Sequence, residues 1–183
     1  MVEDILVLVN DNDEATGFAS KSEVHRKGLL HRAFSVFLYN SSDNTLLIHR
    51  RATGKYHSGG LWTNTCCSHP RKEETLMQAV KRRMDEELGI SLQTQDMGKY
   101  HIHKLGSFKY FYQFENCSEH EIDHVFSIVV CREIYPINYD RNEIEEIQWI
   151  KLEKLEKWML LKPADFTAWF TKAYILFKNH IKQ

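Results

Sequence analysis

Apolar residues recur every fourth position in TLMQAVKRRMDEELG, residues 75–89. The repeat consists of Leu76, Val80, Met84 and Leu88. This spacing places all four side chains on one stripe of an α-helix. Gly89 follows the last of them and is typical of a helix end. We therefore predict a helix over residues 75–89 with one buried side.

Shorter runs rich in β-branched and aromatic residues, bounded by turn residues, predict strands in much of the remaining chain. Two of these runs flank the turn residues SSDN and predict a hairpin. The predicted strands cover residues 4–10, 33–40, 45–51, 99–114, 120–131 and 143–150. We interpret residues 10–17 as a turn and residues 21–34 as a connecting segment.

The C-terminal part, residues 152–181, has a helical pattern that Pro163 divides into two pieces. Residues 51–74 are rich in Gly, His and Ser and are long for a loop, which indicates a functional role. Strands mixed with inserted helices predict an α+β fold. The length of 183 residues predicts a single domain spanning residues 1–183.

The composition is ordinary for a soluble globular protein, with 43% hydrophobic and 27% charged residues. The net charge of -1 offers no global field to attract nucleic acid or a membrane. The four cysteines lack framework spacing, no signal peptide is recognisable, and no apolar run reaches about 18 residues. We expect a cytoplasmic protein with reduced thiols, as a monomer or dimer.

The segment TNTCCSHP, residues 63–70, lies just ahead of the predicted helix. It brings Cys67 and His69 close to the carboxylates of that helix. A thiol at such a place can be a nucleophile, an acid/base group or a metal ligand, or it can simply be packed in the core. These alternatives remain open for Cys67, whereas for Cys66 we expect packing.

The segment EHEIDH, residues 119–124, carries acidic residues at every second position. Side chains two apart on a strand share a face, so Glu119 and Glu121 project together, with Asp123 next in line. They form either an exposed acidic edge or a cation site, because adjacent like charges are costly without a cation or a proton between them.

Imidazoles elsewhere in the chain could complete a cation site with these carboxylates. The candidates are His25, His31 and His69, and three imidazoles with two carboxylates suit Mn²⁺, Zn²⁺ or Fe²⁺. We interpret the remaining histidines as ordinary core or surface residues: His49, His57, His101, His103, His120, His124 and His180.

The predicted helix carries a spacing that resembles the Nudix box of metal-dependent hydrolases. The matching residues are Glu74, Arg82, Met84, Glu86, Glu87, Gly89 and Ile90. Ser68 stands where the box has Gly, and Arg83 where it has its first Glu. An Arg in place of a carboxylate repels a cation but suits a diphosphate, with which it forms forked hydrogen bonds. Taken alone, Glu86 and Glu87 are better explained as part of a solvated helix face with salt bridges, and it is the wider spacing that favours the box.

The motifs along the chain, taken together, indicate one family more specifically than the spacing on the helix, which many hydrolases share. TNTCCSHP, RRMDEELG and EHEID, preceded by His25 and by LLHRAF (residues 29–34), resemble the type 1 isopentenyl diphosphate isomerases. The resemblance runs from Lys21 to Glu121 and includes Trp169. It implies a Nudix-like mixed β-sheet sandwiched by helices, and interconversion of isopentenyl and dimethylallyl diphosphate.

The resemblance also implies roles for individual residues. Cys67 and Glu121 would be the two acid/base groups. Tyr110, with Tyr112 as the alternative, would hydrogen-bond the acid/base carboxylate, and Trp169, with Trp62 as the other candidate, would lie at the hydrocarbon end.

Two cations and an anion site are implied in the same way. One divalent metal would be held by His25, His31, His69, Glu119 and Glu121. A Mg²⁺ bound with the substrate diphosphate would be held by Glu87. The diphosphate itself would be held by Lys21, Arg51, Lys55, Ser68 and Arg83.

Two other classes of function remain open from the sequence. One is a Nudix hydrolase that cleaves a nucleoside or isoprenoid diphosphate, against which Arg83 argues. The other is a non-catalytic binding module for RNA or a protein partner, against which the near-neutral charge and the intact Cys, His and Glu set argue.

Overall fold

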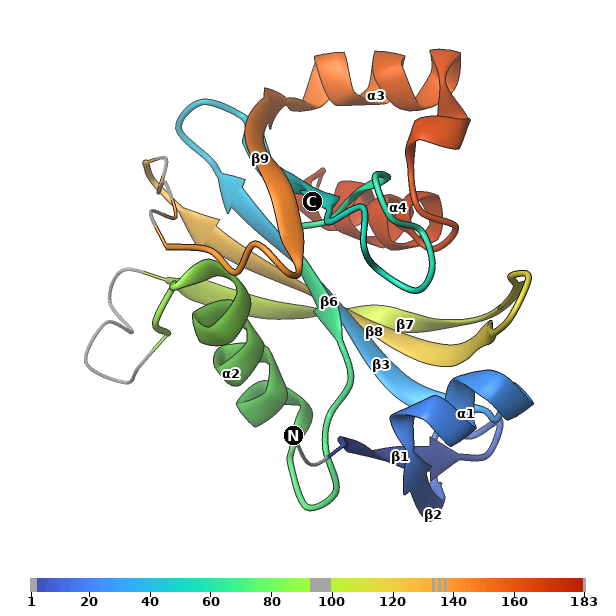
Figure 1. The fold of residues 1–183 in the computed structure, drawn as a ribbon. Helices are drawn as coiled ribbons and strands as arrows, with labels where there is room; N and C mark the ends of the chain where they lie inside the picture. The colour runs from blue at the N-terminus through green and yellow to red at the C-terminus, as the bar shows by residue number, and fades with distance from the viewer. Residues whose placement is uncertain (1–2, 93–99, 133, 135, 137, 183) are drawn as a thin grey trace.

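The computed structural model describes residues 3–92, 100–132, 134, 136 and 138–182, and these form a mixed nine-stranded sheet with helices on both faces (Figure 1). The strands are β1 (Ile5–Val9), β2 (Ala15–Ser20), β3 (His31–Asn40), β4 (Thr45–Arg51), β5 (Trp62–Thr63), β6 (Cys66–Ser68), β7 (His101–Gln113), β8 (Ser118–Val130) and β9 (Ile144–Lys151). The helices are α1 (Lys21–Lys27), α2 (Leu76–Leu88), α3 (Leu152–Leu161), the 3₁₀ turn η2 (Pro163–Asp165) and α4 (Phe170–Ile181).

The strand β3 organises the sheet. Along one edge it pairs in parallel with β8 over its whole length. Along the other edge it pairs in turn with β1, β6 and β4, all antiparallel. The strand β3 therefore has β8 along one edge and three strands in succession along the other, with β6 in the middle.

The helix α2 covers one face of the sheet, as its apolar stripe predicts. Its buried residues pack against alternate residues of β3, namely Phe34, Val36 and Leu38. Thr75 caps the start of the helix in a capping box with Gln78. Gly89 ends it with φ of 64°, a backbone conformation that favours glycine.

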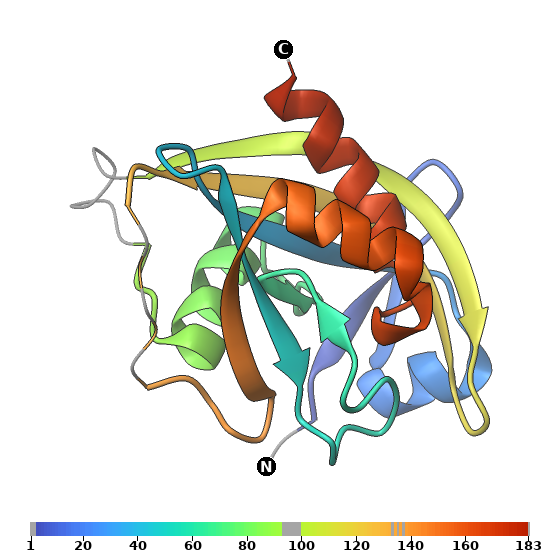
Figure 2. The same cartoon turned by 90° about the horizontal axis from the view of Figure 1, so that it is seen from above.

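The helices α3 and α4 cover the opposite face (Figure 2). There Phe37 of β3 packs against Phe170, Tyr174 and Phe177 of α4. Within the described residues, each helix is too short or too polar to span a bilayer.

The α+β class and the predicted strands are confirmed, although residue 99, where one predicted strand starts, lies outside the described residues. Two local predictions are wrong. Residues 21–34 are not only a connecting segment, because α1 occupies their first part; residues 15–20, partly assigned to a turn, form β2 against β1. The helix α1 has only seven residues, too few for a clear apolar repeat, and its visible signals are its caps, Ser20 and Gly28.

Replacing Met84 by Ala should lower the free energy of unfolding by about 2–5 kcal/mol, because this side chain of α2 is fully buried against the sheet and its loss leaves a cavity. Asp85→Ala, at the neighbouring exposed position, is the control and should change it by less than about 0.5 kcal/mol. Urea denaturation measures both. Equal effects of the two substitutions would contradict the assigned helix face.

Candidate active site and metal centre

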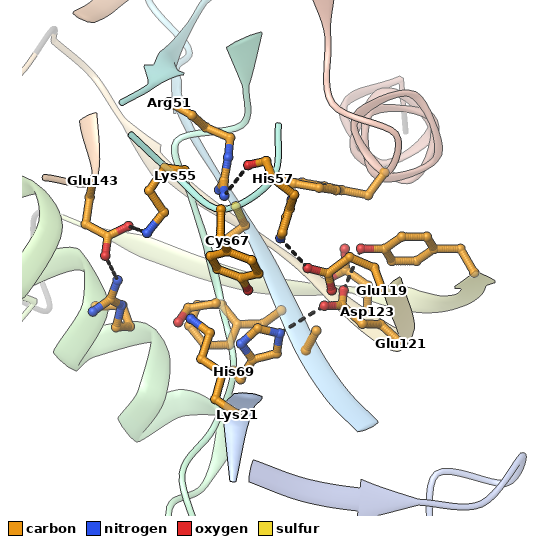
Figure 3. A pocket seen from close by; sticks show the side chains of 17 residues that line it. Lys21, Arg51, Lys55, His57, Cys67, His69, Glu119, Glu121, Asp123 and Glu143 are labelled. Atoms are coloured by element: carbon orange, nitrogen blue, oxygen red, sulfur yellow. Dashed lines mark hydrogen bonds and ion pairs between the residues drawn. The ribbon is translucent and has the colours of Figure 1, made fainter. Parts of the chain in front are cut away.

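Strand register brings the candidate acid/base residues to one cleft. Ser35 of β3 pairs with Cys67 of β6, and His31 of β3 pairs with Glu121 of β8. Odd-numbered residues of β3 share a face, so Cys67 and Glu121 border the same cleft from opposite edges of that strand (Figure 3).

The cleft collects most of the other residues named from the sequence. Its further lining includes Lys21, Arg51, Lys55, Ser68, His69, Arg83, Tyr110, Glu119 and Trp169. Asp123, the third acidic residue of the β8 row, also lines it. Trp62 and Tyr112, the two alternative candidates, are not among the lining residues.

The candidate metal ligands form a compact buried cluster. Ligand atoms of His25, His31, His69, Glu119 and Glu121 all lie within 4.8 Å of one another. Within the described part of the chain, Nε2 of His25, Nε2 of His31 and Oε2 of Glu119 are buried without a hydrogen-bond partner. Such groups are rare because each costs free energy unless satisfied. The donor set therefore fits a divalent cation.

Electrostatics supports the same conclusion. Burial, aided by the neighbouring His69 and His31, lowers the pKa of His25 to about 2, and burial lowers the pKa of His69 to about 4. Both rings are neutral at physiological pH, which is the form that binds metals. Burial and the adjacent Glu121 raise the pKa of Glu119 well above its ordinary value. Two buried carboxylates this close need a compensating cation to be ionised together.

Protein groups already orient several of these ligands. Nδ1 of His31 lies 2.8 Å from the carbonyl oxygen of Leu29, which leaves Nε2 facing the cluster. The hydroxyl of Tyr110 donates to Oε2 of Glu121 at 2.7 Å, and Nε2 of His69 lies 2.9 Å from Oε1 of the same carboxylate. Tyr110, rather than Tyr112, makes this contact.

The two adjacent cysteines face opposite sides of the sheet. Cys66 is fully buried in the core beneath α2, as expected, and its thiol lies 3.5 Å from Oε2 of Glu87. Cys67 faces the cleft. Burial raises the pKa of the Cys67 thiol to about 12, so this thiol is protonated at neutral pH.

Four cationic side chains line the cleft: Lys21, Arg51, Lys55 and Arg83. Lys55 and Arg83 both contact Glu143, with Nζ of Lys55 at 2.6 Å and a guanidinium nitrogen of Arg83 at 3.5 Å. Arg83 also pairs with Glu87, whose carboxylate is buried. The interpretation of Glu87 as part of a solvated helix face is therefore wrong.

Sequence reasoning missed two polar residues of the site. His57, interpreted as an ordinary residue, is buried with Nε2 2.6 Å from Oε1 of Glu119. The unusual length and composition of residues 51–74 were the only available signal for it. Glu143 gave none, because it reaches Lys55 only after β9 returns beside β4.

Comparison with known proteins first defines the class. Residues 29–170 match the NUDIX domain family, which covers most of the chain, and the chain belongs to that family.

Relatives narrow the assignment further. Isopentenyl-diphosphate Delta-isomerase 2 of Photorhabdus laumondii is 40% identical over 93% of this chain and 90% of its own length. Isopentenyl-diphosphate Delta-isomerase of Aliivibrio fischeri (strain ATCC 700601 / ES114) is 40% identical over 97% of both chains. The chain belongs to this isomerase family.

Solved structures agree on the fold. DR0079 from Deinococcus radiodurans superposes with a TM-score of 0.71 at 22% identity, over 96% of this chain and 98% of that one. The MutT protein from Methanosarcina mazei Go1 gives 0.62 at 19% identity, over 84% and 96%.

Adding Mn²⁺ or Zn²⁺ to the metal-free protein should raise its melting temperature, because a cation that binds only the folded chain stabilises it by about 2.7 kcal/mol at one hundred times its dissociation constant. His31→Ala, which removes a buried ligand, should lose most of this increase relative to its own metal-free baseline. His103→Ala, at an exposed position, should retain it. An unchanged increase in His31→Ala would argue against the cluster as the metal site.

Proposed function

We propose that this protein interconverts isopentenyl diphosphate and dimethylallyl diphosphate. The observation that supports this most strongly is one cleft bordered by the protonated thiol of Cys67 and the carboxylate of Glu121, at opposite edges of β3. The same cleft carries a group of cationic side chains and the buried ring of Trp169.

The chemistry requires two proton transfers on a carbon skeleton with no polar group of its own. A proton adds to the terminal alkene carbon, positive charge develops on the tertiary carbon, and a proton leaves the neighbouring carbon as the double bond forms there. Cys67 and Glu121 serve as the two acid/base groups. The site must also exclude water, which would trap the cation. The Trp169 ring contributes about 2 kcal/mol or more through a cation–π contact.

The metal centre is part of this proposal because Glu121 is both a proposed acid/base group and a candidate metal ligand. His25, His31, His69, Glu119 and Glu121 would hold one divalent cation, Mn²⁺, Zn²⁺ or Fe²⁺. When bound, the cation supplies the positive charge that lets both buried carboxylates remain ionised. Tyr110 holds Glu121 in place by its hydrogen bond.

The cationic group of the cleft would bind the diphosphate. Its members are Lys21, Arg51, Lys55 and Arg83, with the hydroxyl of Ser68. Mg²⁺ commonly binds through one or two carboxylates together with substrate phosphates, and Glu87 would supply such a carboxylate here. In the protein alone, both oxygens of Glu87 face donors, Arg83 on one side and the Cys66 thiol on the other.

Isomerisation is favoured over the hydrolysis typical of the Nudix box because of Arg83. A hydrolytic site gathers carboxylates around cations that activate water. Here Arg83 stands among Glu86, Glu87 and Glu143 and pairs with all three. Its guanidinium opposes a cluster of cations and favours an anionic ligand. We further propose that residues 1–183 act as one domain on this small substrate in the cytoplasm.

Incubation with isopentenyl diphosphate in deuterated water should place deuterium in the allylic product without release of inorganic phosphate. Cys67→Ala should reduce this turnover by about 10²–10⁴-fold, the usual contribution of a positioned acid or base. Cys131→Ala, at an exposed thiol outside the cleft lining, is the matched control. Near-normal exchange in a folded Cys67→Ala protein, or stoichiometric phosphate release by the unaltered protein, would refute the proposal.

Glu87→Gln should weaken substrate binding by about 10–100-fold, which corresponds to the 1.5–3 kcal/mol of a charged contact. The loss should depend on Mg²⁺, because the substitution removes only the charge of the proposed ligand. Glu86→Gln, on the exposed side of the same helix, tests whether any charge change near Arg83 has this effect. Titration of KM against Mg²⁺ measures it, and a loss that is independent of Mg²⁺ would contradict a cation at Glu87.

A further inference from the structure

The loop between β4 and β5 is closed by its own backbone. The amide of Arg51 donates to the carbonyl of Leu61 at 2.9 Å, and the amide of Gly60 returns to the carbonyl of Arg51 at 3.0 Å. A Cβ atom at Gly59 would lie only 2.5 Å from the carbonyl oxygen of Thr53, so this position requires glycine. These hydrogen bonds therefore tie the two ends of the loop together, and Tyr56 and His57 project from it.

The ring of His57 is fixed on several sides. It stacks on Phe114 with ring centres 4.5 Å apart and lies edge-on to Tyr56 at 4.5 Å. Trp169 borders it at 6.1 Å, and the backbone carbonyl of His57 accepts a hydrogen bond from Arg51 at 3.4 Å. A ring held this firmly can fix whatever group its nitrogens contact.

That group is Glu119. Nε2 of His57 lies 2.6 Å from Oε1 of Glu119, within hydrogen-bond distance, and both side chains are almost fully buried (Figure 3). The other oxygen, Oε2, has no hydrogen-bond partner among the described residues and lies 3.6 Å from Nε2 of His25, inside the ligand cluster. The contact with His57 thus directs one oxygen of Glu119 to the protein and the other to the cluster.

Tyr56 stands in the same relation to His25. Its hydroxyl lies 3.2 Å from Nδ1 of His25, and Nε2 of that ring faces the cluster with no hydrogen-bond partner in the described part of the chain. Each of the two neighbouring loop residues therefore contacts the outward atom of one candidate metal ligand.

We infer that His57 and Tyr56 are positioning residues for the metal centre, His57 acting through Glu119 and Tyr56 through His25. This inference rests on the proposed metal site. Hydrogen-bond partners of this kind orient metal ligands, and their loss commonly costs 10–100-fold in metal affinity. The same loop carries Lys55 at the cationic side of the cleft, so one segment borders both the metal and the anion side.

The test compares His57→Ala with His57→Gln in the full chain, by competition for Zn²⁺ against a chelator and by the absorption spectrum of bound Co²⁺. His57→Ala should weaken metal binding by about 10–100-fold. His57→Gln, whose amide can donate from a similar place, should retain most of the affinity and the Co²⁺ spectrum. His124→Gln is the matched control, because His124 is a buried histidine on the other face of β8, paired with Asp13 at 2.9 Å.

Each outcome has a separate meaning. Unchanged affinity in His57→Ala, or an equal loss in His57→Gln and His57→Ala, would overturn the assignment of His57. Tyr56→Phe removes only a hydroxyl and should also weaken binding; unchanged affinity there would overturn the assignment of Tyr56. Failure of the unaltered protein to bind any divalent ion would instead overturn the metal site itself.

Discussion

The placement of two carboxylates side by side in the protein interior is the constraint on which the rest of this site depends. Glu119 and Glu121 are both about 95% or more buried on one face of β8. Like charges in such a place are unstable unless protonated or balanced by a cation. Three imidazoles and the unsatisfied polar atoms among these groups in the described part of the chain have the composition of a cation site. Many of the surrounding contacts accordingly hold these groups in place.

The central strand explains how such a cluster and a thiol come to share a cleft. Because β3 pairs with β8 on one edge and with β6 on the other, its register fixes the positions of Glu121 and Cys67 together. Alternate residues of β3 pack under α2 and so anchor that register in the core. A shift by one residue would turn His31 away from the cluster, to the opposite face of the sheet. The register of β3 therefore determines both the packing of the core and the geometry of the site.

The sequence predicted those features in which the type of residue and its spacing along the chain point to the same structure. The stripe of α2 and the alternation of Glu119 and Glu121 follow from local geometry, and both appear in the structure. The helix α1 escaped because seven residues are too few for a clear apolar repeat. The strand β2 escaped because its sequence, ATGFAS, is mostly small residues and has no apolar alternation. His57 and Glu143 escaped for another reason. Each becomes part of the site through a contact with a residue more than 60 positions away, which no local pattern encodes.

In the helix α2, one residue that differs from the Nudix box changes the charge of the site. Glu74 and Arg82, two matching positions of the box, pair with each other at 2.7 Å and tie the loop before the helix to its middle turn. That pair is structural and would serve a hydrolase equally well. Arg83 is different, because it brings a fixed positive charge among carboxylates that would otherwise gather cations. The helix framework is thus retained while the charge at one position of the box is reversed, and the histidines and glutamates across the cleft form a group that fits a divalent cation.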